Sequence, residues 1–426
     1  MSFLFILFYN IIFYPSFFLF SIIGIAFNKK YREGFVSRFY SLYILRRYFN
    51  KVDVNSNIYW FHCSSRGEYL QVETLIDKVK DCSKNNLVLV SFFSPSGYNS
   101  LLSPKVDLKI FLPFDFFWSI NSALKIVNPK KIIFATTDLW PNMLTIAKIK
   151  NIETIVIGAK SNQSFGKKYS IKKLVYKYLY SKVSKIFTIN SDDSLHFKNI
   201  FNNDEKVLIT DKGNPRYDQV LSTINSIPSK LKVSVLHRNK TILFASMHRE
   251  DRNIILPHIL PLMQQNTDFD IIWASHEPSK SDSRYLDSIF SRYNISVGVF
   301  NSIESLRTLD SRVKVVEVVG ILSKLYWLSR FAYVGGGFST GVHNLMEPSI
   351  AKTPTIFGPN YKSFNEAIDL IKIKGGFSIV DGESFIKQFD KLLSDDNLIL
   401  DASSSAERFI KKNAGATNRI INDLVD

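Results

Sequence analysis

The 426-residue chain contains only two cysteines, Cys63 and Cys82, and neither lies in a metal-ligand spacing. A disulfide framework is therefore excluded, and a reducing compartment is the simplest inference. The sequence also lacks internal repeats and long low-complexity tracts. Because 46% of the residues are hydrophobic, the chain is not disordered, and its length predicts two or three domains.

Charged residues are absent from positions 1–28, which consist mainly of Phe, Ile and Leu. As one helix this segment would be about 42 Å long, against about 30 Å of membrane hydrocarbon. No basic region precedes it and no small-residue cleavage site ends it, which argues against a secretory signal. We predict a membrane anchor, either a tilted span or an interfacial segment bent at Pro15, with a buried core helix as the alternative. Basic residues follow directly: Lys29, Lys30, Arg32, Arg38, Arg46 and Arg47. The positive-inside rule then places the rest of the chain in the cytoplasm.

Acidic residues are too few to balance the basic ones in the first half of the chain. Residues 29–220 contain 30 basic and 16 acidic residues, whereas the remainder contains 24 and 22. A basic half indicates an anionic partner, which can be a nucleic acid, an acidic lipid or a phosphorylated substrate. No RNA- or DNA-binding motif is recognisable, so we predict no nucleic-acid partner.

Short apolar runs alternate with amphipathic helical segments from residue 58 onward. Such alternation predicts βαβ units and parallel sheets. A polar stretch, 211–239, reads as a linker, so we predict an α/β protein of two Rossmann-like domains facing a cleft, 29–220 and 221–426. The predicted strands are Ile58–His62, Leu87–Phe93, Lys131–Ala135, Thr154–Ile157, Lys185–Ile189, Thr241–Ala245, Asp270–Ala274, Val313–Val316 and Phe331–Val334.

The predicted strand Phe331–Val334 is followed by Gly335, Gly336 and Gly337 and by a helical pattern over residues 343–351. A strand, a glycine turn and a helix N-terminus in this order form a seat for a phosphate. His343, Asn344 and Glu347 share one face of the expected helix, where Glu347 can bind a ribose diol. An ordinary strand-to-helix crossover is the alternative, because glycine loops are weak motifs.

Two carboxylates follow strands of the first domain. Glu68 lies at the head of a helix and can act as a general base toward a hydroxyl, although Ser65 to Glu68 also fits a capping box. Asp138 is expected in the same cleft, and its alternative role is the N-cap of a helix that starts near Pro141.

Three polar residues follow strands of the second domain. Ser246 and Arg249 can bind a phosphate, with a solvated charged loop as the alternative. His276 follows the next strand, and a structural role is its alternative. Eight lysines between positions 160 and 185 suit either a solvated helix face or acidic lipid headgroups.

Taken together, these stretches resemble the Kdo transferases, the lipid A glycosyltransferases that have the two-domain GT-B fold. The resemblance covers nearly the whole chain. Its motifs, in order, are WFHCSSRGEYLQ, SFFSPSGY, DLWPN, GNPRYD, SHEP, GGGFSTGVHNLMEP and IFGPNYKSFNEA.

The resemblance implies site residues. The glutamate of the family's short S-x-G-E motif, which activates the acceptor hydroxyl, falls on Glu68. The second carboxylate falls on Asp138, where family members usually carry Glu. Arg66 stands where the family usually has a small or apolar residue, and Met247 stands where it usually has Thr. The implied donor-binding residues are Ser246, Arg249, His276, Gly336, Gly337, Asn344 and Glu347, with Asn360 and Asn365 closing the donor pocket.

The resemblance also implies an activity: inverting transfer of Kdo from CMP-Kdo to the lipid A precursor, lipid IVA, without a metal or other cofactor. The expected location is the cytoplasmic face of the inner membrane. Another GT-B enzyme, either a UDP-sugar transferase or a UDP-sugar epimerase, is one alternative. A non-catalytic membrane protein that binds a nucleotide or lipid is the other.

Overall fold

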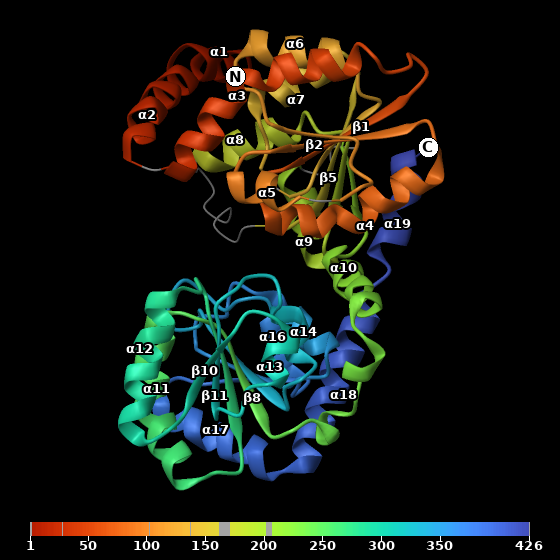
Figure 1. Cartoon of the computed structure of the whole chain (residues 1–426). Helices are drawn as coiled ribbons and strands as arrows, with labels where there is room; N and C mark the ends of the chain where they lie inside the picture. The colour runs from red at the N-terminus through yellow and green to blue at the C-terminus, as the bar shows by residue number, and fades with distance from the viewer. Residues whose placement is uncertain are drawn as a thin grey trace. The chain divides into compact units, whose positions relative to one another are not determined.

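The computed structural model describes residues 2–27, 29–101, 103–136, 138–161, 171–201 and 207–425. It divides into two compact units (Figure 1). The first comprises Met1–Gln219 with Ala414–Asp426, and the second comprises Val220–Asn413. Each unit contains one seven-stranded sheet, and all the paired strands of both sheets run parallel. The predicted α/β class is therefore confirmed.

The first sheet has the strand order β3-β2-β1-β4-β5-β6-β7. Strand β1 is buried on both faces because its side chains alternate between two cores: Trp60 packs in one, and Tyr59 and Phe61 pack in the other. The order reverses between β1 and β4, and ligands of such sheets bind beyond the carboxyl ends at this point. The strands are β1 (Asn57–Cys63), β2 (Asn86–Phe92), β3 (Leu108–Phe111), β4 (Lys131–Phe134), β5 (Glu153–Ala159), β6 (Lys185–Thr188) and β7 (Leu208–Asp211).

The second sheet has the order β10-β11-β9-β8-β12-β13-β14, which reverses between β8 and β12. Trp273 and Phe244 stack within its core, with ring centroids 5.3 Å apart. The strands are β8 (Thr241–Met247), β9 (Asp270–Ser275), β10 (Val297–Phe300), β11 (Val313–Val316), β12 (Phe331–Val334), β13 (Thr355–Phe357) and β14 (Gly376–Ser378).

Helices cover both faces of each sheet (Figure 1). Those of the first unit, after the N-terminal segment, are α3 (Lys29–Phe49), α4 (Arg66–Cys82), α5 (Pro95–Ser100), α6 (Phe117–Val127), α7 (Pro141–Ile149), α8 (Ile171–Tyr180), α9 (Ser191–Ile200) and α10 (Arg216–Thr223). Those of the second are α11 (Arg249–Gln265), α12 (Lys280–Phe290), α13 (Ile303–Arg307), α14 (Leu322–Tyr326), α15 (Met346–Ile350), α16 (Asn365–Lys372), α17 (Gly382–Ser394) and α18 (Asp396–Asn413), followed by α19 (Ala416–Val425).

The last helix, α19, packs on the first unit. Its residues Ala416, Ile420 and Leu424 are buried in the same core as Tyr59 and Phe61 of β1. We predicted that the second domain extends to Asp426, but the second unit ends at Asn413. The apolar face of α19 continues the first core, and burying it there removes that face from water.

Helix α10 occupies part of the predicted linker. Its Asp218 carboxylate accepts hydrogen bonds from the backbone N–H groups of Gly415 at 2.5 Å and Thr417 at 2.9 Å. The polar composition of 211–239 was therefore a poor guide, because one helix and three short 3₁₀ turns lie within that stretch.

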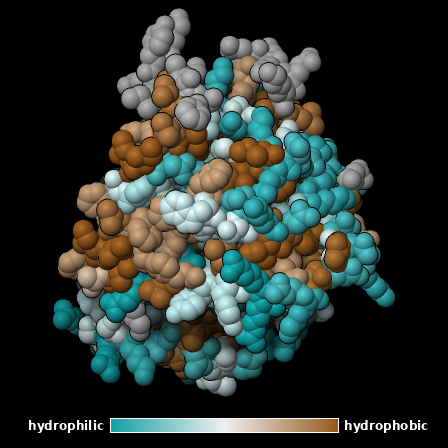
Figure 2. All heavy atoms as spheres, turned by 90° about the horizontal axis from the view of Figure 1, so that it is seen from above, coloured by the Kyte–Doolittle hydropathy of each residue, from teal (hydrophilic) through white to brown (hydrophobic). Residues whose placement is uncertain are grey.

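The N-terminal segment consists of α1 (Ser2–Phe8), a π-helical turn (Tyr9–Phe13) and α2 (Tyr14–Phe27). Residues Leu4–Phe27 are long and apolar enough to cross a membrane, and 17% of the most apolar window is buried. The buried-core-helix alternative is therefore not what the structure shows. Hydrophobic side chains gather on the side of the first unit where α1 and α2 lie (Figure 2), including the exposed Leu4, Phe8, Ile11, Phe13, Leu19, Phe20, Ile23 and Phe27.

One face of this segment is nevertheless attached to the first unit. Tyr9 and Tyr14 are buried, and the Tyr9 hydroxyl donates to the Asp115 carboxylate at 2.9 Å. The side-chain amides of Asn10 and Asn142 donate to each other at 2.9 and 2.8 Å. The segment therefore presents an apolar outer face while polar contacts hold its inner face in place.

Candidate active site

The glycine loop after β12 is held by a buried carboxylate of the second unit. Asp251, in the first turn of α11, accepts hydrogen bonds from the Tyr333 hydroxyl at 2.8 Å and from the Gly336 N–H at 2.7 Å. It also accepts longer bonds from the N–H groups of Phe338 and His248, at 3.4 and 3.3 Å. Asp251 thus joins the ends of β8 and β12, the two strands at the reversal of the second sheet.

This arrangement corrects the expected phosphate seat. The Gly336 N–H points to Asp251, so it is already used, and helix α15 begins only at Met346. His343 and Asn344 consequently precede the helix and do not share a helical face with Glu347. The Asn344 amide instead donates to the Glu347 carboxylate at 2.9 Å and accepts from the Met346 N–H at 2.9 Å. Asn344 and Glu347 are therefore neighbours, as predicted, but for a different reason.

Close backbone packing explains two of the glycines. A Cβ on Gly335 would lie 2.3 Å from the carbonyl oxygen of Ser246, and one on Gly337 would lie 2.5 Å from the Gly358 nitrogen. Ser246 itself has a φ of 52°, an unusual conformation for a residue with a side chain. The loop thus presses against the ends of β8 and β13, which brings Ser246 to it.

The remaining predicted donor-binding residues lie around the same loop or on neighbouring helices. The Asn360 N–H donates to the Gly337 carbonyl at 2.9 Å, and the Asn360 amide donates to Ser339 O at 2.8 Å. Arg249 is exposed at the start of α11, and Asn365 is the first residue of α16.

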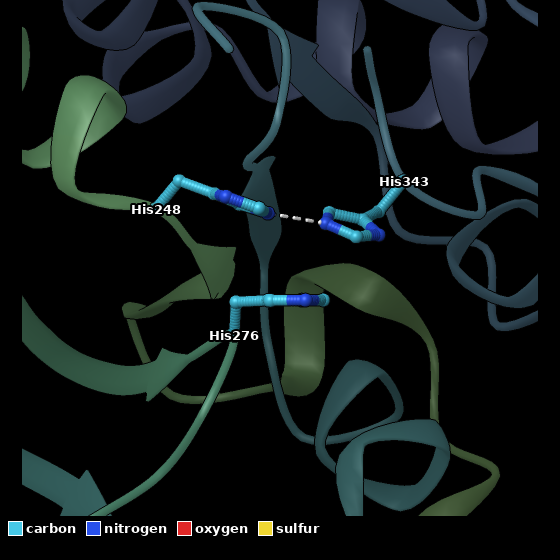
Figure 3. A group of neighbouring side chains, drawn as sticks. All are labelled: His248, His276 and His343. Atoms are coloured by element: carbon cyan, nitrogen blue, oxygen red, sulfur yellow. Dashed lines mark hydrogen bonds between the residues drawn. The ribbon is translucent and has the colours of Figure 1, made fainter. Parts of the chain in front are cut away.

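Three histidines meet at the carboxyl ends of these strands. His248, His276 and His343 each offer a ring nitrogen, and these nitrogens all lie within 4.8 Å of one another. His248 and His343 point toward each other, with their Nε2 atoms 2.7 Å apart, and His276 lies beside both (Figure 3). Burial, together with the two neighbouring histidines, lowers the pKa of His343 to about 4, and burial also lowers the pKa of His276.

A metal ion fits this histidine arrangement poorly as it stands. The three rings are stacked at interplanar angles of 20°, 22° and 26°, so their in-plane lone pairs do not converge on one point. Two nitrogens of a tetrahedral zinc site lie about 3.4 Å apart at the usual bond length. The 2.7 Å separation instead suits a hydrogen bond in which one ring donates to the other.

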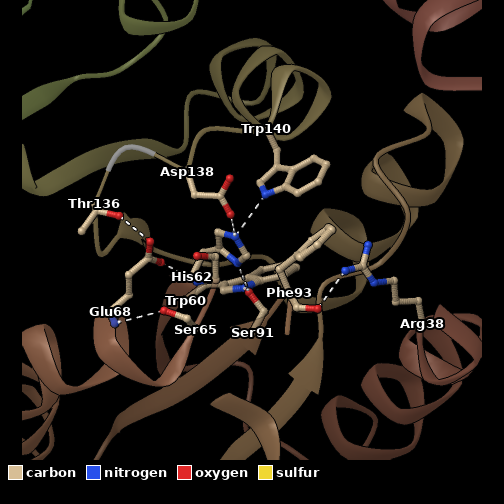
Figure 4. Close-up of polar contacts among 11 residues, drawn as sticks. Arg38, Trp60, His62, Ser65, Glu68, Ser91, Phe93, Thr136, Asp138 and Trp140 are labelled. Atoms are coloured by element: carbon tan, nitrogen blue, oxygen red, sulfur yellow. Dashed lines mark hydrogen bonds and ion pairs between the residues drawn. The ribbon is translucent and has the colours of Figure 1, made fainter. Parts of the chain in front are cut away.

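Glu68 lies at the reversal of the first sheet, after β1. Its Oε2 accepts from the Ser64 N–H at 2.5 Å, and its Oε1 accepts from the Thr136 hydroxyl at 2.7 Å (Figure 4). Ser65 is the N-cap of α4, with its hydroxyl 3.5 Å from the Glu68 N–H. Glu68 therefore caps the start of α4, as the capping alternative predicted, but it does so by accepting from the Ser64 N–H. The Thr136 hydroxyl after β4 also orients its half-buried carboxylate.

Asp138 lies beside His62 at the same edge. Its Oδ2 is 3.4 Å from Nε2 of His62, and its side chain is 37% exposed. The same Nε2 is 3.1 Å from the Trp140 indole nitrogen, which can only donate. His62 Nε2 is thus an acceptor, and Nδ1 donates to Ser91 at 3.0 Å, so we infer that the Asp138 carboxylate is not engaged by the histidine.

The N-cap alternative for Asp138 is wrong. Helix α7 starts at Pro141, its N-cap Trp140 makes no side-chain capping bond, and its first N–H groups are bound by a distant carboxylate. Asp115 accepts from the N–H of Asn142 at 3.0 Å and of Met143 at 3.1 Å. Burial raises the pKa of this fully enclosed carboxyl to about 7. Asp138 is therefore left available for other contacts.

Comparison with known proteins shows a family to which part of this chain is similar. The profile of the 3-deoxy-D-manno-octulosonic-acid transferase (kdotransferase) family matches residues 40–219, the part of the chain that contains Glu68 and Asp138. A 3-deoxy-D-manno-octulosonic acid transferase of Chlamydophila psittaci is 24% identical over 78% of this chain and 77% of its own length. Residues 40–219 therefore match the profile of the Kdo transferase family.

Two further comparisons extend this result. A bifunctional glycosyltransferase/methyltransferase of Fusobacterium nucleatum is 25% identical over 79% of this chain. The chain spans about half, 53%, of that relative. The solved structure of UDP-GlcNAc 2-epimerase from Neisseria meningitidis superposes with a TM-score of 0.60 at 14% identity, covering 87% of this chain and 99% of that one. This likeness shows the fold alone, which is the GT-B fold expected of a Kdo transferase.

Several residues of the candidate site were missed in the sequence. The S-x-G-E stretch singled out Glu68, but Thr136, His62 and Asp251 reach the sites only through contacts between strands far apart in the chain. Of the eight lysines between positions 160 and 185, Lys167 and Lys168 lie outside the described part of the chain, as do the side chains of Lys172 and Lys173.

Proposed function

We propose that this chain is a Kdo transferase, which moves Kdo from CMP-Kdo to lipid IVA at the cytoplasmic face of the inner membrane, with inversion and without a metal ion. The observation that carries the proposal is the Glu68 carboxylate, which two donors hold at the reversal of the first sheet. The matched family profile covers this residue.

Glu68 acts as the general base. It removes the proton from the primary hydroxyl of the acceptor as that oxygen attacks the anomeric carbon of Kdo from the face opposite CMP. The bond from the anomeric carbon to the phosphate oxygen breaks, and CMP leaves with the electron pair. The hydrogen bonds from Ser64 and Thr136 fix the carboxylate, so little ordering remains for the reaction step. Asp138, 37% exposed beside His62, is the second carboxylate of this reaction.

Donor binding belongs to the second unit in this proposal. The leaving group has a single phosphate. Its charge can be stabilised without a divalent ion by Arg249, Ser246 and His276. Glu347 holds the ribose, and its bond from Asn344 orients it. Gly336, Gly337, Asn360 and Asn365 shape the pocket around CMP.

The N-terminal segment and the basic first unit bind the acceptor's membrane. The exposed apolar side chains of α1 and α2 enter the lipid, while the basic residues that follow bind anionic headgroups. The polar attachment of Tyr9 and Asn10 favours an interfacial position over a perpendicular span.

The test is incubation of the purified chain with CMP-Kdo and lipid IVA, in which the product mass is followed with and without EDTA. We expect lipid IVA to gain Kdo mass equally in both, with inverted anomeric configuration by NMR. A chelator-sensitive reaction would overturn the metal-free part, and transfer from a UDP-sugar in place of CMP-Kdo would replace the donor.

A Glu68→Gln variant separates the enzyme from a non-catalytic binder. We expect kcat to fall at least about 100-fold, as for the loss of a general base, at an unchanged melting temperature. Arg66→Gln on the exposed side of the same turn is the matched control. Unchanged turnover in Glu68→Gln would remove the proposed base.

A further inference from the structure

A cavity of about 350 Å³ lies in the first unit between the N-terminal segment and α3. Its wall is largely aromatic and includes Phe17 and Phe18 of α2 and Phe35 of α3. Its volume falls within the usual range for small-molecule pockets, about 300–1,000 Å³. An apolar group of a ligand would therefore fit here.

Arg38 is a buried, charged residue of this cavity wall. The side chain is only 7% exposed, and its guanidinium carbon lies 3.8 Å from the centre of the Phe93 ring. Nη2 donates to the Phe93 carbonyl at 2.9 Å, but Nε has no hydrogen-bond partner. Among the described residues no carboxylate forms an ion pair with Arg38.

A buried guanidinium without an acid is costly, because its lost hydration is not replaced. Burial lowers the pKa of Arg38 to about 10, which still leaves it charged at neutral pH. Such a group gains most from an anionic ligand with several oxygens, since the guanidinium fork matches phosphate geometry.

The cavity is adjacent to the candidate catalytic residues. Phe93, which covers Arg38, stacks on Trp140 with ring centroids 5.3 Å apart. The Trp140 indole in turn donates to His62, the neighbour of Asp138. Figure 4 shows Arg38, Phe93, Trp140 and Asp138 along this row.

We propose that this cavity is the acceptor subsite: Arg38 binds a phosphate of the acylated acceptor, and the aromatic wall holds one of its acyl chains. This rests on the proposed function, because the acceptor is the phosphorylated glycolipid named there.

The experiment measures binding apart from turnover. The full chain with Glu68→Gln is presented with lipid IVA in nanodiscs, and with the same lipid after enzymatic removal of its phosphates. Arg38→Met keeps the length of the side chain and removes the charge, and Arg292→Met, which removes an exposed charge of the second unit, is the control. Deacylated, water-soluble disaccharide bisphosphate is the third ligand.

We expect Arg38→Met to weaken binding of lipid IVA at least about tenfold, to leave binding of the dephosphorylated lipid within about twofold, and to raise the melting temperature. The gain in melting temperature is expected because removal of an unpaired buried charge relieves its desolvation cost. Arg292→Met should change none of these. A Phe17→Ser variant should weaken binding of both lipids but not of the deacylated bisphosphate.

Two outcomes would overturn the proposal. Equal weakening for phosphorylated and dephosphorylated lipid, with a lowered melting temperature, would make Arg38 a structural residue. Full affinity of Arg38→Met for lipid IVA would remove the subsite. If the wild-type chain transferred no Kdo to lipid IVA while the phosphate-dependent loss held, the proposed function would fail and the lipid site would stand.

Discussion

The carboxylate of Asp251 accepts a hydrogen bond from the Gly336 N–H at 2.7 Å, across 85 residues of sequence. The glycine loop is therefore fixed by an internal anion before any ligand arrives. A loop whose amide is already ordered loses less conformational freedom on binding a nucleotide, so the acid preorganises the site.

Replacing Asp251 by Asn should destabilise the second unit by about 2–3 kcal/mol. Asn places an N–H₂ group where Gly336 and Tyr333 donate, so at least one buried donor loses its acceptor. Calorimetric unfolding measures the loss, and titration with CMP should show weaker binding. Tyr333→Phe, which removes one donor only, should cost about 1 kcal/mol. Equal effects of the two substitutions would mean that the Gly336 bond contributes nothing.

Local patterns predicted those parts of the fold whose side chains are buried on both faces. The apolar run Phe331–Val334 was predicted with its observed bounds. Strands β3, β7, β10 and β14 were missed because they are short and only partly buried, as in Leu108–Phe111. Helix α10 was missed because Gly213, Asn214 and Pro215 precede it and suggested a loop.

At the sites, too, features that depend on neighbouring residues in the sequence were easier to predict than long-range contacts. Glu68 could be named because its motif and its helix start are local in the sequence. The start of α15 was misplaced because the Asn344 side chain binds the Met346 N–H and ends the preceding loop there. Contacts such as Asp115 with Tyr9 and with Asn142 depend on the packed fold, and no periodicity in one segment indicates them.

Asp138 is expected to act through its charge and to tolerate a longer side chain. Asp138→Asn should lower kcat by about 10–100-fold because the carboxylate is lost, whereas Asp138→Glu should retain at least half of the activity. Initial rates with saturating CMP-Kdo measure both. His62→Gln should alter the position of Trp140 without matching the loss in Asp138→Asn. Full activity of Asp138→Asn would exclude this residue from the reaction.

Donor binding should be linked to proton uptake by His276 and His343. In the unliganded protein, burial and mutual repulsion lower the pKa values of His343 and His276, so both are neutral at pH 7. The carboxylates nearest to them, Asp251 and Glu277, oppose this shift only in part. A phosphate nearby favours the protonated rings, so affinity should rise as the pH falls from 8 to 6.

A stable cytidine 5′-phosphodiester is the suitable probe, because it does not titrate in this range. Calorimetry in buffers of different ionisation enthalpy should report proton uptake, and His343→Asn should reduce it. Cytidine alone should bind without the pH trend. A pH trend shared by cytidine would assign the protons to another group.

The buried Asp115 should make the first unit less stable as the pH rises from about 4 to about 7. Its folded pKa of about 7 lies above the ordinary 3.8, so within this window the folded chain binds more protons than the unfolded chain. Stability then falls with increasing pH. Asp115→Asn removes the titration. The melting temperature of wild type minus that of the variant should therefore decrease steadily as the pH rises toward 7.

An Asp53→Asn control, on the loop after α3, should give a curve of melting temperature against pH that is parallel to that of wild type. If the Asp115→Asn curve also ran parallel, the carboxyl would have to be ionised throughout, held by the Tyr9, Asn142 and Met143 donors.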